Sequence, residues 1–118
     1  VILWGSGKPK REFLFVDDLA NAIFYLLKLS NRKLLNISKN FPIFNIGSGE
    51  EISIKDLAYK IKRICKFEGK IFFDKSFPDG TFRKNLDSSR IKKTGWRPKI
   101  QLNQGLVKVL ENYNKKNL

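Results

Sequence analysis

Residues 4–20 have the sequence WGSGKPKREFLFVDDLA. The apolar residues that precede the first glycine predict a strand running into a Gly/Pro turn, and residues 13–16 predict a second short strand. Asp17 and Asp18 then predict a helix N-cap and an acid in the first helical turn. Because apolar residues recur at helical spacing from here, we expect an amphipathic helix over about residues 18–29.

The rest of the chain continues to alternate between strand and helix patterns. Residues 30–40 are polar and predict an exposed loop. A strand is expected at 43–46, closed by Gly47-Ser48-Gly49, and a capping box at Ser53–Asp56 starts a helix whose apolar stripe runs up to Cys65. A strand at 71–73 and a turn at Pro78-Asp79-Gly80 follow. The last expected elements are one or two helical turns at 88–94, ended by Gly95, and a helix from 102 to 113 that frays over 114–117. This alternation predicts an α/β fold, or α+β for the chain in isolation.

Length and composition limit the class of protein. The chain has 118 residues, which fits one domain or a piece of a larger protein. Hydrophobic residues make up 42%, too many for a disordered basic tail. Lys and Arg outnumber Asp and Glu by 24 to 11, and the net charge of +13 suits an anionic ligand, a nucleic acid or simply a lysine-rich proteome. Most aromatic residues lie in apolar runs, which favours a core over a stacking platform for nucleic acid.

The residue types that are scarce exclude other classes. One cysteine and no histidine exclude an internal disulfide, the usual zinc sites and a Ser-His or Cys-His nucleophile within this chain. We expect a cytoplasmic protein, because a single cysteine cannot form an internal disulfide. No signal peptide opens the sequence, and no apolar run is long enough to span a membrane. Methionine is absent, and the chain starts with strand-like Val1-Ile2-Leu3. We therefore expect a C-terminal fragment that lacks its N-terminal portion.

Four residues are candidates for contacts with a ligand, and each has a structural alternative. Arg11 offers a planar fork of donors that fits a phosphate, or it pairs with Glu12 or Asp17 on the surface. The indole of Trp4, next to flexible glycines, suits a base or sugar face, or it is a core residue at a strand end. Asp79 suits sugar hydroxyls, or it is an ordinary turn residue. Lys84, together with its neighbour Arg83, suits a phosphate, or the two form a solvated pair.

Two other features have mainly structural interpretations. Gly47-Ser48-Gly49 before a helix has the backbone amides to meet a phosphate, but a plain strand-to-helix turn is favoured because neither a third glycine nor a Walker lysine follows. Cys65 lies on a helix stripe, and we expect it to be a core thiol.

Four segments together resemble the GDP-L-fucose synthase family of extended short-chain dehydrogenases/reductases. They are Trp4-Gly-Ser-Gly-Lys-Pro-Lys-Arg-Glu-Phe-Leu-Phe-Val-Asp-Asp-Leu-Ala, Asn45-Ile-Gly-Ser-Gly, Pro78-Asp-Gly-Thr-Phe-Arg-Lys and Gly95-Trp-Arg-Pro. The segments run in order and cover nearly the whole chain. The first and third carry the more specific signal. Phe77, Phe82 and Asn85 depart from the residues usual in the family.

The resemblance implies the C-terminal, substrate-binding part of a larger enzyme. Such an enzyme uses NADPH to convert GDP-4-keto-6-deoxy-D-mannose to GDP-L-fucose by epimerisation and reduction, and it is typically a homodimer. Trp4, Arg11 and Asp79 match family positions that bind the GDP-sugar, and Lys84 is a weaker candidate for the same pocket. The NADP-binding Rossmann domain is expected upstream, because this chain lacks both a Gly-x-Gly-x-x-Gly fingerprint and a Tyr-x-x-x-Lys motif.

The resemblance implies a limited role for this chain, and two other functions remain as alternatives. No catalytic, cofactor-binding or metal-binding residue is expected within residues 1–118, and the chain alone is expected to be inactive. No nucleic acid or membrane partner is expected. The first alternative is another nucleotide-sugar epimerase or dehydratase of the same superfamily. A small basic nucleic-acid-binding module is the alternative from a different class.

Overall fold

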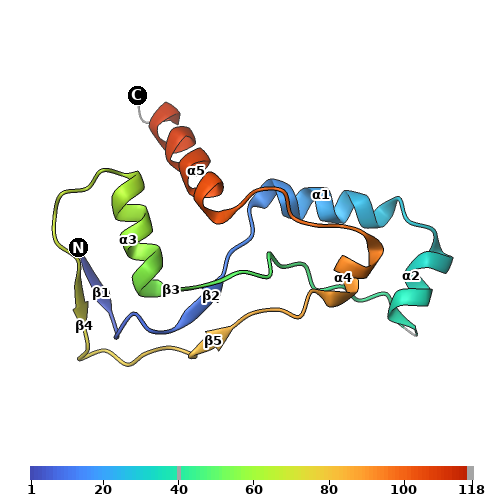
Figure 1. Cartoon of the computed structure of the whole chain (residues 1–118), viewed down its shortest axis with the longest axis horizontal. Coiled ribbons are helices and arrows are strands. Elements are labelled where there is room, and N and C mark those ends of the chain that lie inside the picture. The colour runs from blue at the N-terminus through green and yellow to red at the C-terminus, as the bar shows by residue number, and fades with distance from the viewer. Residues whose placement is uncertain (40, 117–118) are drawn as a thin grey trace. The chain divides into compact units, whose positions relative to one another are not determined.

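The computed structural model describes residues 1–39 and 41–116, which form a mixed arrangement of helices and short strands (Figure 1). The mixed fold class predicted from the sequence is thereby confirmed. The chain divides into two compact units, which are described separately. Unit 1 comprises residues 1–11, 51–84 and those from 102 onward, and unit 2 comprises residues 12–50 and 85–101.

Unit 1 is built on short parallel strand pairs and two helices. Its elements are β1 (Ile2–Trp4), β2 (Lys10–Glu12, whose last residue begins unit 2), β3 (Glu51–Ser53), α3 (Ile54–Ile64), β4 (Phe72–Asp74), β5 (Arg83–Lys84) and α5 (Leu102–Lys116). β1 and β4 pair in parallel, with Trp4 opposite Asp74, and they lie side by side in Figure 1. β2 lies between β3 and β5 and pairs in parallel with β5. These pairings bring the first residues of the chain beside residues 72–84.

Helix α3 begins with the predicted capping arrangement. The Ser53 hydroxyl accepts a hydrogen bond from the Asp56 backbone N–H at 3.0 Å and donates to the Asp56 carboxylate at 2.6 Å. The apolar stripe of α3 faces a cavity of about 410 Å³ rather than a closed core, and Val1 and Leu3 of the first strand segment line the same cavity. Cys65 also lines it and is exposed, so the prediction of a core thiol was wrong.

Unit 2 holds the buried hydrophobic residues. Its elements are α1 (Val16–Leu27), α2 (Asn31–Ser38) and α4 (Ser89–Thr94). Ala22, Ile91 and Trp96 are buried together. The indole N–H of Trp96 donates to the side-chain oxygen of Asn21 at 3.1 Å, so its polar group is satisfied inside the unit. α4 ends, as predicted, at Gly95, whose φ of 104° suits glycine.

Asp18 has a different role from the one its position predicted. Helix α1 starts at Val16 with Phe15 as its N-cap, and no side chain caps it. Asp17 and Asp18 do supply first-turn acids. The carboxylate of Asp18 is only 3% exposed, and it accepts backbone N–H bonds from Lys99 and Ile100 at 2.8–3.1 Å. It therefore connects α1 to the segment that follows Trp96.

Two predicted strands and one predicted loop were wrong. Residues 13–16 are not a strand, because they lead into α1, which starts at Val16, and the strand pairing is made by β2 (Lys10–Glu12) instead. Residues 43–46 form no strand, although Phe44 and Ile46 pack against the buried core of unit 2. Most of the expected loop at 30–39 is helix α2, since the Ser30 side chain caps it by accepting the Lys33 N–H. Residue 40 lies outside the described residues.

The later boundaries also differ from expectation. The chain turns at Lys75–Ser76 rather than at 78–80, because Asp74 accepts hydrogen bonds from the backbone N–H and hydroxyl of Ser76. α5 continues to Lys116, so the predicted fraying at 114–116 was wrong, and residue 117 lies outside the described residues.

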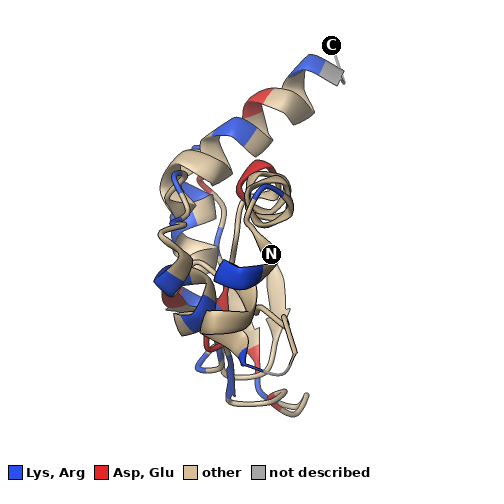
Figure 2. Ribbon diagram, turned by 90° about the vertical axis from the view of Figure 1, so that its right-hand side faces the viewer, with Lys and Arg blue, Asp and Glu red and all other residues tan. Residues whose placement is uncertain are grey.

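Basic residues are distributed over several elements rather than confined to one. They occur on α2, α3, α4 and α5, as the blue segments of Figure 2 illustrate, whereas α1 has none. Within residues 1–39 and 41–116, no helix combines the length and apolar character needed to cross a bilayer.

Candidate functional site

The loop after β1 depends on two glycines with positive φ. Gly5 has φ 81° and Gly7 has φ 73°, a region that side-chain-bearing residues rarely adopt. A Cβ on Gly5 would collide with the Asp79 carboxylate, and a Cβ on Gly7 would lie 2.5 Å from the Phe73 ring. The two glycines therefore let the loop after Trp4 pass close to β4 and to the segment that follows it.

Asp79 holds this loop through Ser6. Its carboxylate accepts the Ser6 backbone N–H at 2.7 Å and the Ser6 hydroxyl at 2.5 Å. The hydrogen bonds from Ser6 lower the pKa of Asp79 from its ordinary value of 3.8, because they favour the charged carboxylate. Each carboxylate oxygen has a further lone pair, so this contact is compatible with an additional hydrogen-bond donor.

Arg11 is anchored by backbone carbonyl groups. Its Nη1 donates to the carbonyl oxygens of Lys10 at 2.6 Å and Thr81 at 2.8 Å. The carboxylate of Glu12, one of the expected surface partners of Arg11, is instead engaged with backbone groups. It accepts the N–H of Gly49 at 2.5 Å and that of Leu86 at 3.0 Å. The guanidinium of Arg11 is thus oriented by its attachment to residue 81.

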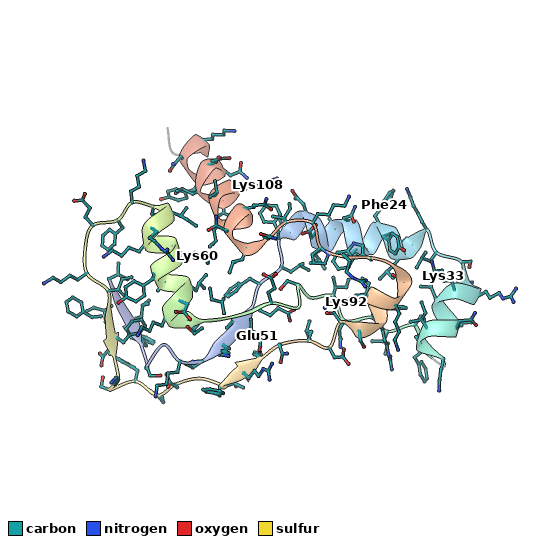
Figure 3. The ribbon with its side chains drawn as sticks, viewed as in Figure 1. Phe24, Lys33, Glu51, Lys60, Lys92 and Lys108 are labelled. Atoms are coloured by element: carbon teal, nitrogen blue, oxygen red, sulfur yellow. The ribbon has the colours of Figure 1, made fainter. Side chains whose placement is uncertain are left out.

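Lys84 is opposite Arg11 in the β2–β5 register and is exposed. Its neighbour Arg83 is opposite Lys10 and makes a two-pronged contact with Glu51, with both N···O distances 2.6 Å. The hydrogen bond from Arg83 lowers the pKa of Glu51, which is labelled in Figure 3. Of the two adjacent cations on β5, Arg83 is therefore committed to a structural pair, and Lys84 is left toward solvent.

Trp4 is not a core residue in this structure. Its side chain is 71% exposed, and its ring stacks on Phe77 with a centroid separation of 4.4 Å and an interplanar angle of 11°. The core alternative for this tryptophan is therefore wrong here. The second tryptophan, Trp96, is the buried one.

Residues 77–81, here called the 77–81 segment, connect three of the four candidate residues. Phe77 contacts Trp4, Asp79 holds Ser6, and the carbonyl oxygen of Thr81 receives Arg11. The segment thus gathers Trp4, Arg11 and Asp79 from regions of the chain that are about 70 residues apart. Lys84 is linked to this group through the pairing of β5 with β2, in which it lies opposite Arg11.

Three residues that shape the site, Ser6, Phe77 and Glu12, were not predicted from the sequence to have these roles. Ser6 lies between two glycines, and a short hydroxyl residue there is a usable sign of a loop clamp. A Cβ at position 47 would lie 2.5 Å from the Glu12 carboxylate, so the Glu12 side chain would have to shift to accept any residue other than glycine there. Since Glu12 takes the N–H of Gly49, the plain structural interpretation of Gly47-Ser48-Gly49 is favoured over a phosphate loop. Phe77 stood out in the sequence only as a departure from the residue usual in the family, and its contact with Trp4 was not predictable because Trp4 belongs to a distant strand.

Comparison with known proteins places these features in a family. Residues 1–47 match the model of the NAD dependent epimerase/dehydratase family. The chain is 47% identical over 111 residues to the GDP-L-fucose synthase of Sinorhizobium fredii, which covers 94% of the chain and 33% of that protein. It is 44% identical over 113 residues to a probable GDP-L-fucose synthase of rice, Oryza sativa subsp. japonica, covering 96% of the chain and 32% of that protein.

The chain is a relative of the GDP-L-fucose synthases. The resemblance predicted from the four motifs is thereby confirmed. The chain spans about a third of the length of these relatives and matches their C-terminal part. Among solved structures, a GDP-mannoheptose C4 reductase from Campylobacter jejuni with NADP bound is similar at 40% identity with a TM-score of 0.79, over 97% of the chain and 34% of the reductase. This family match favours the enzyme interpretation over a nucleic-acid-binding module.

Proposed function

We propose that residues 1–118 are the C-terminal nucleotide-sugar-binding domain of an NADP-dependent enzyme that converts GDP-4-keto-6-deoxy-D-mannose to GDP-L-fucose. The observation that carries this proposal is that the 77–81 segment contacts both Trp4 and Arg11 and contains Asp79. An exposed indole, a guanidinium and a carboxylate are the groups needed for a base, a diphosphate and sugar hydroxyls, respectively. The identity to GDP-L-fucose synthases supports this choice of nucleotide sugar.

Each residue is assigned a binding role rather than a reacting one. A guanidinium has five N–H donors, and those on Nη1 of Arg11 face carbonyl oxygens, so we assign Nε and Nη2 to the diphosphate. The exposed indole face of Trp4 covers the guanine ring. Asp79 accepts hydrogen bonds from sugar hydroxyls while it holds Ser6. Lys84 adds positive charge beside Arg11.

The reaction itself is assigned to residues outside this chain. Epimerisation follows removal of a proton next to the keto group, and NADPH supplies the hydride that reduces the ketone. The residues present do not fit a dinucleotide site, because the chain has no Gly-x-Gly-x-x-Gly sequence. The chain therefore binds and orients the nucleotide sugar, and no proton or hydride step is assigned to it.

The direct test is turnover by the complete gene product. Purified protein supplied with GDP-4-keto-6-deoxy-D-mannose and NADPH is expected to consume NADPH and to release GDP-L-fucose, identified by chromatography against a standard. A 4-keto GDP-heptose is the competing substrate, because the Campylobacter reductase acts on a GDP-mannoheptose. Preferential reduction of the heptose would move the chain to that other group of GDP-sugar reductases.

The binding role is tested at Arg11. Arg11→Lys is expected to raise the dissociation constant of GDP about 10- to 150-fold, which corresponds to about 1.5–3 kcal/mol, because lysine cannot reproduce a forked contact to phosphate. The measurement is GDP titration of the complete gene product at fixed ionic strength, since salt screens such contacts. Arg83→Lys is the matched control and should change GDP affinity less than about twofold, because Arg83 pairs with Glu51. Equal affinities for the wild-type protein and Arg11→Lys would reject the diphosphate assignment.

A further inference from the structure

Phe77 is the aromatic contact that orients the exposed Trp4 side chain. The two rings are nearly parallel, at 11°, with centroids 4.4 Å apart, which falls just short of the range in which aromatic pairs are most common. The indole is 71% exposed, so few other atoms restrict its rotation. One face of the indole lies against Phe77, and the opposite face is the one available to a ligand.

The position of Phe77 is itself fixed on both sides along the chain. Before it, Asp74 accepts the N–H and hydroxyl of Ser76 at 3.0 and 2.6 Å, and the Gly5 N–H donates to the Asp74 carbonyl oxygen at 2.8 Å. After it, Asp79 holds Ser6. The turn at Lys75–Ser76 therefore places the Phe77 ring against Trp4 from a backbone that is tied at two points, Gly5 and Ser6, to the loop after β1.

A side chain that is held before binding loses less conformational freedom when its ligand arrives. Ordering one mobile side chain costs about 0.5–1.5 kcal/mol, which corresponds to about a 2- to 12-fold change in affinity. Phe77 removes part of this cost, because stacking on its ring already restricts the orientation of the Trp4 indole. It also places a second π system behind the first, so the ligand base meets the outer ring of a stacked pair.

We propose that Phe77 is a positioning residue for nucleotide binding, which acts through Trp4 and strengthens the stacking of the guanine base without contacting the ligand. This inference rests on the proposed function, since it requires that a guanine nucleotide binds at Trp4. The role inferred for Phe77 is in recognition of the guanine base and not of the diphosphate. Loss of Phe77 therefore weakens GDP binding and leaves pyrophosphate binding unchanged.

Three variants of the complete gene product separate this role from a general structural one. Phe77→Leu keeps apolar bulk but removes the ring, and it should raise the dissociation constant of GDP about 2- to 12-fold. Phe77→Tyr keeps the ring and should restore the wild-type affinity. Phe82→Leu, at a second exposed phenylalanine that is 65% exposed, is the matched control and should leave GDP affinity unchanged.

Two further readouts are specific to the stack. In enzyme assays Phe77→Leu should raise the KM for the GDP-sugar with kcat unchanged, because the ring acts on binding alone. The fluorescence of Trp4, isolated by subtracting the spectrum of the matching Trp4→Phe variant, should change in Phe77→Leu. Inhibition by pyrophosphate serves as the probe that lacks a base.

The outcomes distinguish this inference from the proposed function. Absence of GDP binding by the wild-type protein would overturn both. GDP binding that is equally tight in Phe77→Leu and Phe82→Leu would overturn the role of Phe77 and leave the proposed function standing. An equal loss of GDP and pyrophosphate affinity in Phe77→Leu would also overturn it, because the effect would then be a general distortion of the 77–81 segment.

Discussion

Unit 2 buries Ala22, Ile91 and Trp96, whereas unit 1 leaves Val1, Ile2 and Trp4 more than 60% exposed. The units also use carboxylates differently. In unit 2, Asp18 is buried and ties α1 to the backbone after Trp96. In unit 1, Asp79 is exposed and holds only the Ser6 loop. Unit 2 therefore contains a small buried core with a buried carboxylate beside it, whereas the carboxylate contact of unit 1 lies at the surface.

The largest effect should come from the buried core of unit 2. Ile91→Ala should lower the free energy of unfolding by about 2–5 kcal/mol, because Ile91 is fully buried and its removal leaves a cavity. Ile2→Ala in unit 1 should cost less than about 0.5 kcal/mol, since Ile2 is 67% exposed. Denaturant unfolding of both variants measures the contrast. Similar losses for the two would mean that unit 1 is packed as closely as unit 2.

The next effect concerns the buried carboxylate. Asp18→Asn should destabilise the protein by about 1.5–3 kcal/mol, the range for hydrogen bonds to a charged group, because Lys99 and Ile100 then share a neutral acceptor. Asp17→Asn is the matched control: it also removes a first-turn acid from α1, but Asp17 is exposed. The difference between the two denaturation midpoints isolates the tie made by Asp18. A difference near zero would argue that this tie is replaceable by water.

The smallest effect is the response of unit 1 to acid. Because Ser6 lowers the pKa of Asp79, the stabilisation it provides is fully present above the ordinary value of 3.8 and is lost as the pH falls through the lowered pKa. The Ser6 amide resonance, followed by NMR from about pH 5 to about pH 2, should therefore shift with a midpoint below 3.8. A midpoint at or above that value would show that the Ser6–Asp79 contact is not maintained in solution.

The sequence was sufficient where local patterns determine the structure. The cap at Ser53, the strand before Trp4 and the stop at Gly95 follow from residues close in the chain, and all three were predicted correctly. It failed where distant partners decide. Residues 43–46 look like a strand, yet Phe44 and Ile46 are used for packing on a core formed by other segments.

The candidate site shows the same limit. Trp4, Arg11 and Asp79 were singled out by residue type and by the family motifs, but their common attachment to the 77–81 segment depends on pairings between residues about 70 positions apart. The partner of Trp4 could not be predicted for this reason. Arg11 is held by carbonyl oxygens of Lys10 and Thr81, and backbone contacts of this kind leave no trace in side-chain patterns.

The division of the chain between the two units has a consequence for synthesis on the ribosome. The chain passes from one unit to the other at residues 11–12, 50–51, 84–85 and 101–102, so each unit is assembled from separated stretches. Unit 2 lacks Ile91 and Trp96 until those residues have emerged, and unit 1 lacks α5 until after that. Neither unit is complete while the first half of these residues is being translated. The contacts of unit 2 cannot be completed until residue 101 has been synthesised, and those of unit 1 only after that, and apolar residues that wait for their partners favour aggregation.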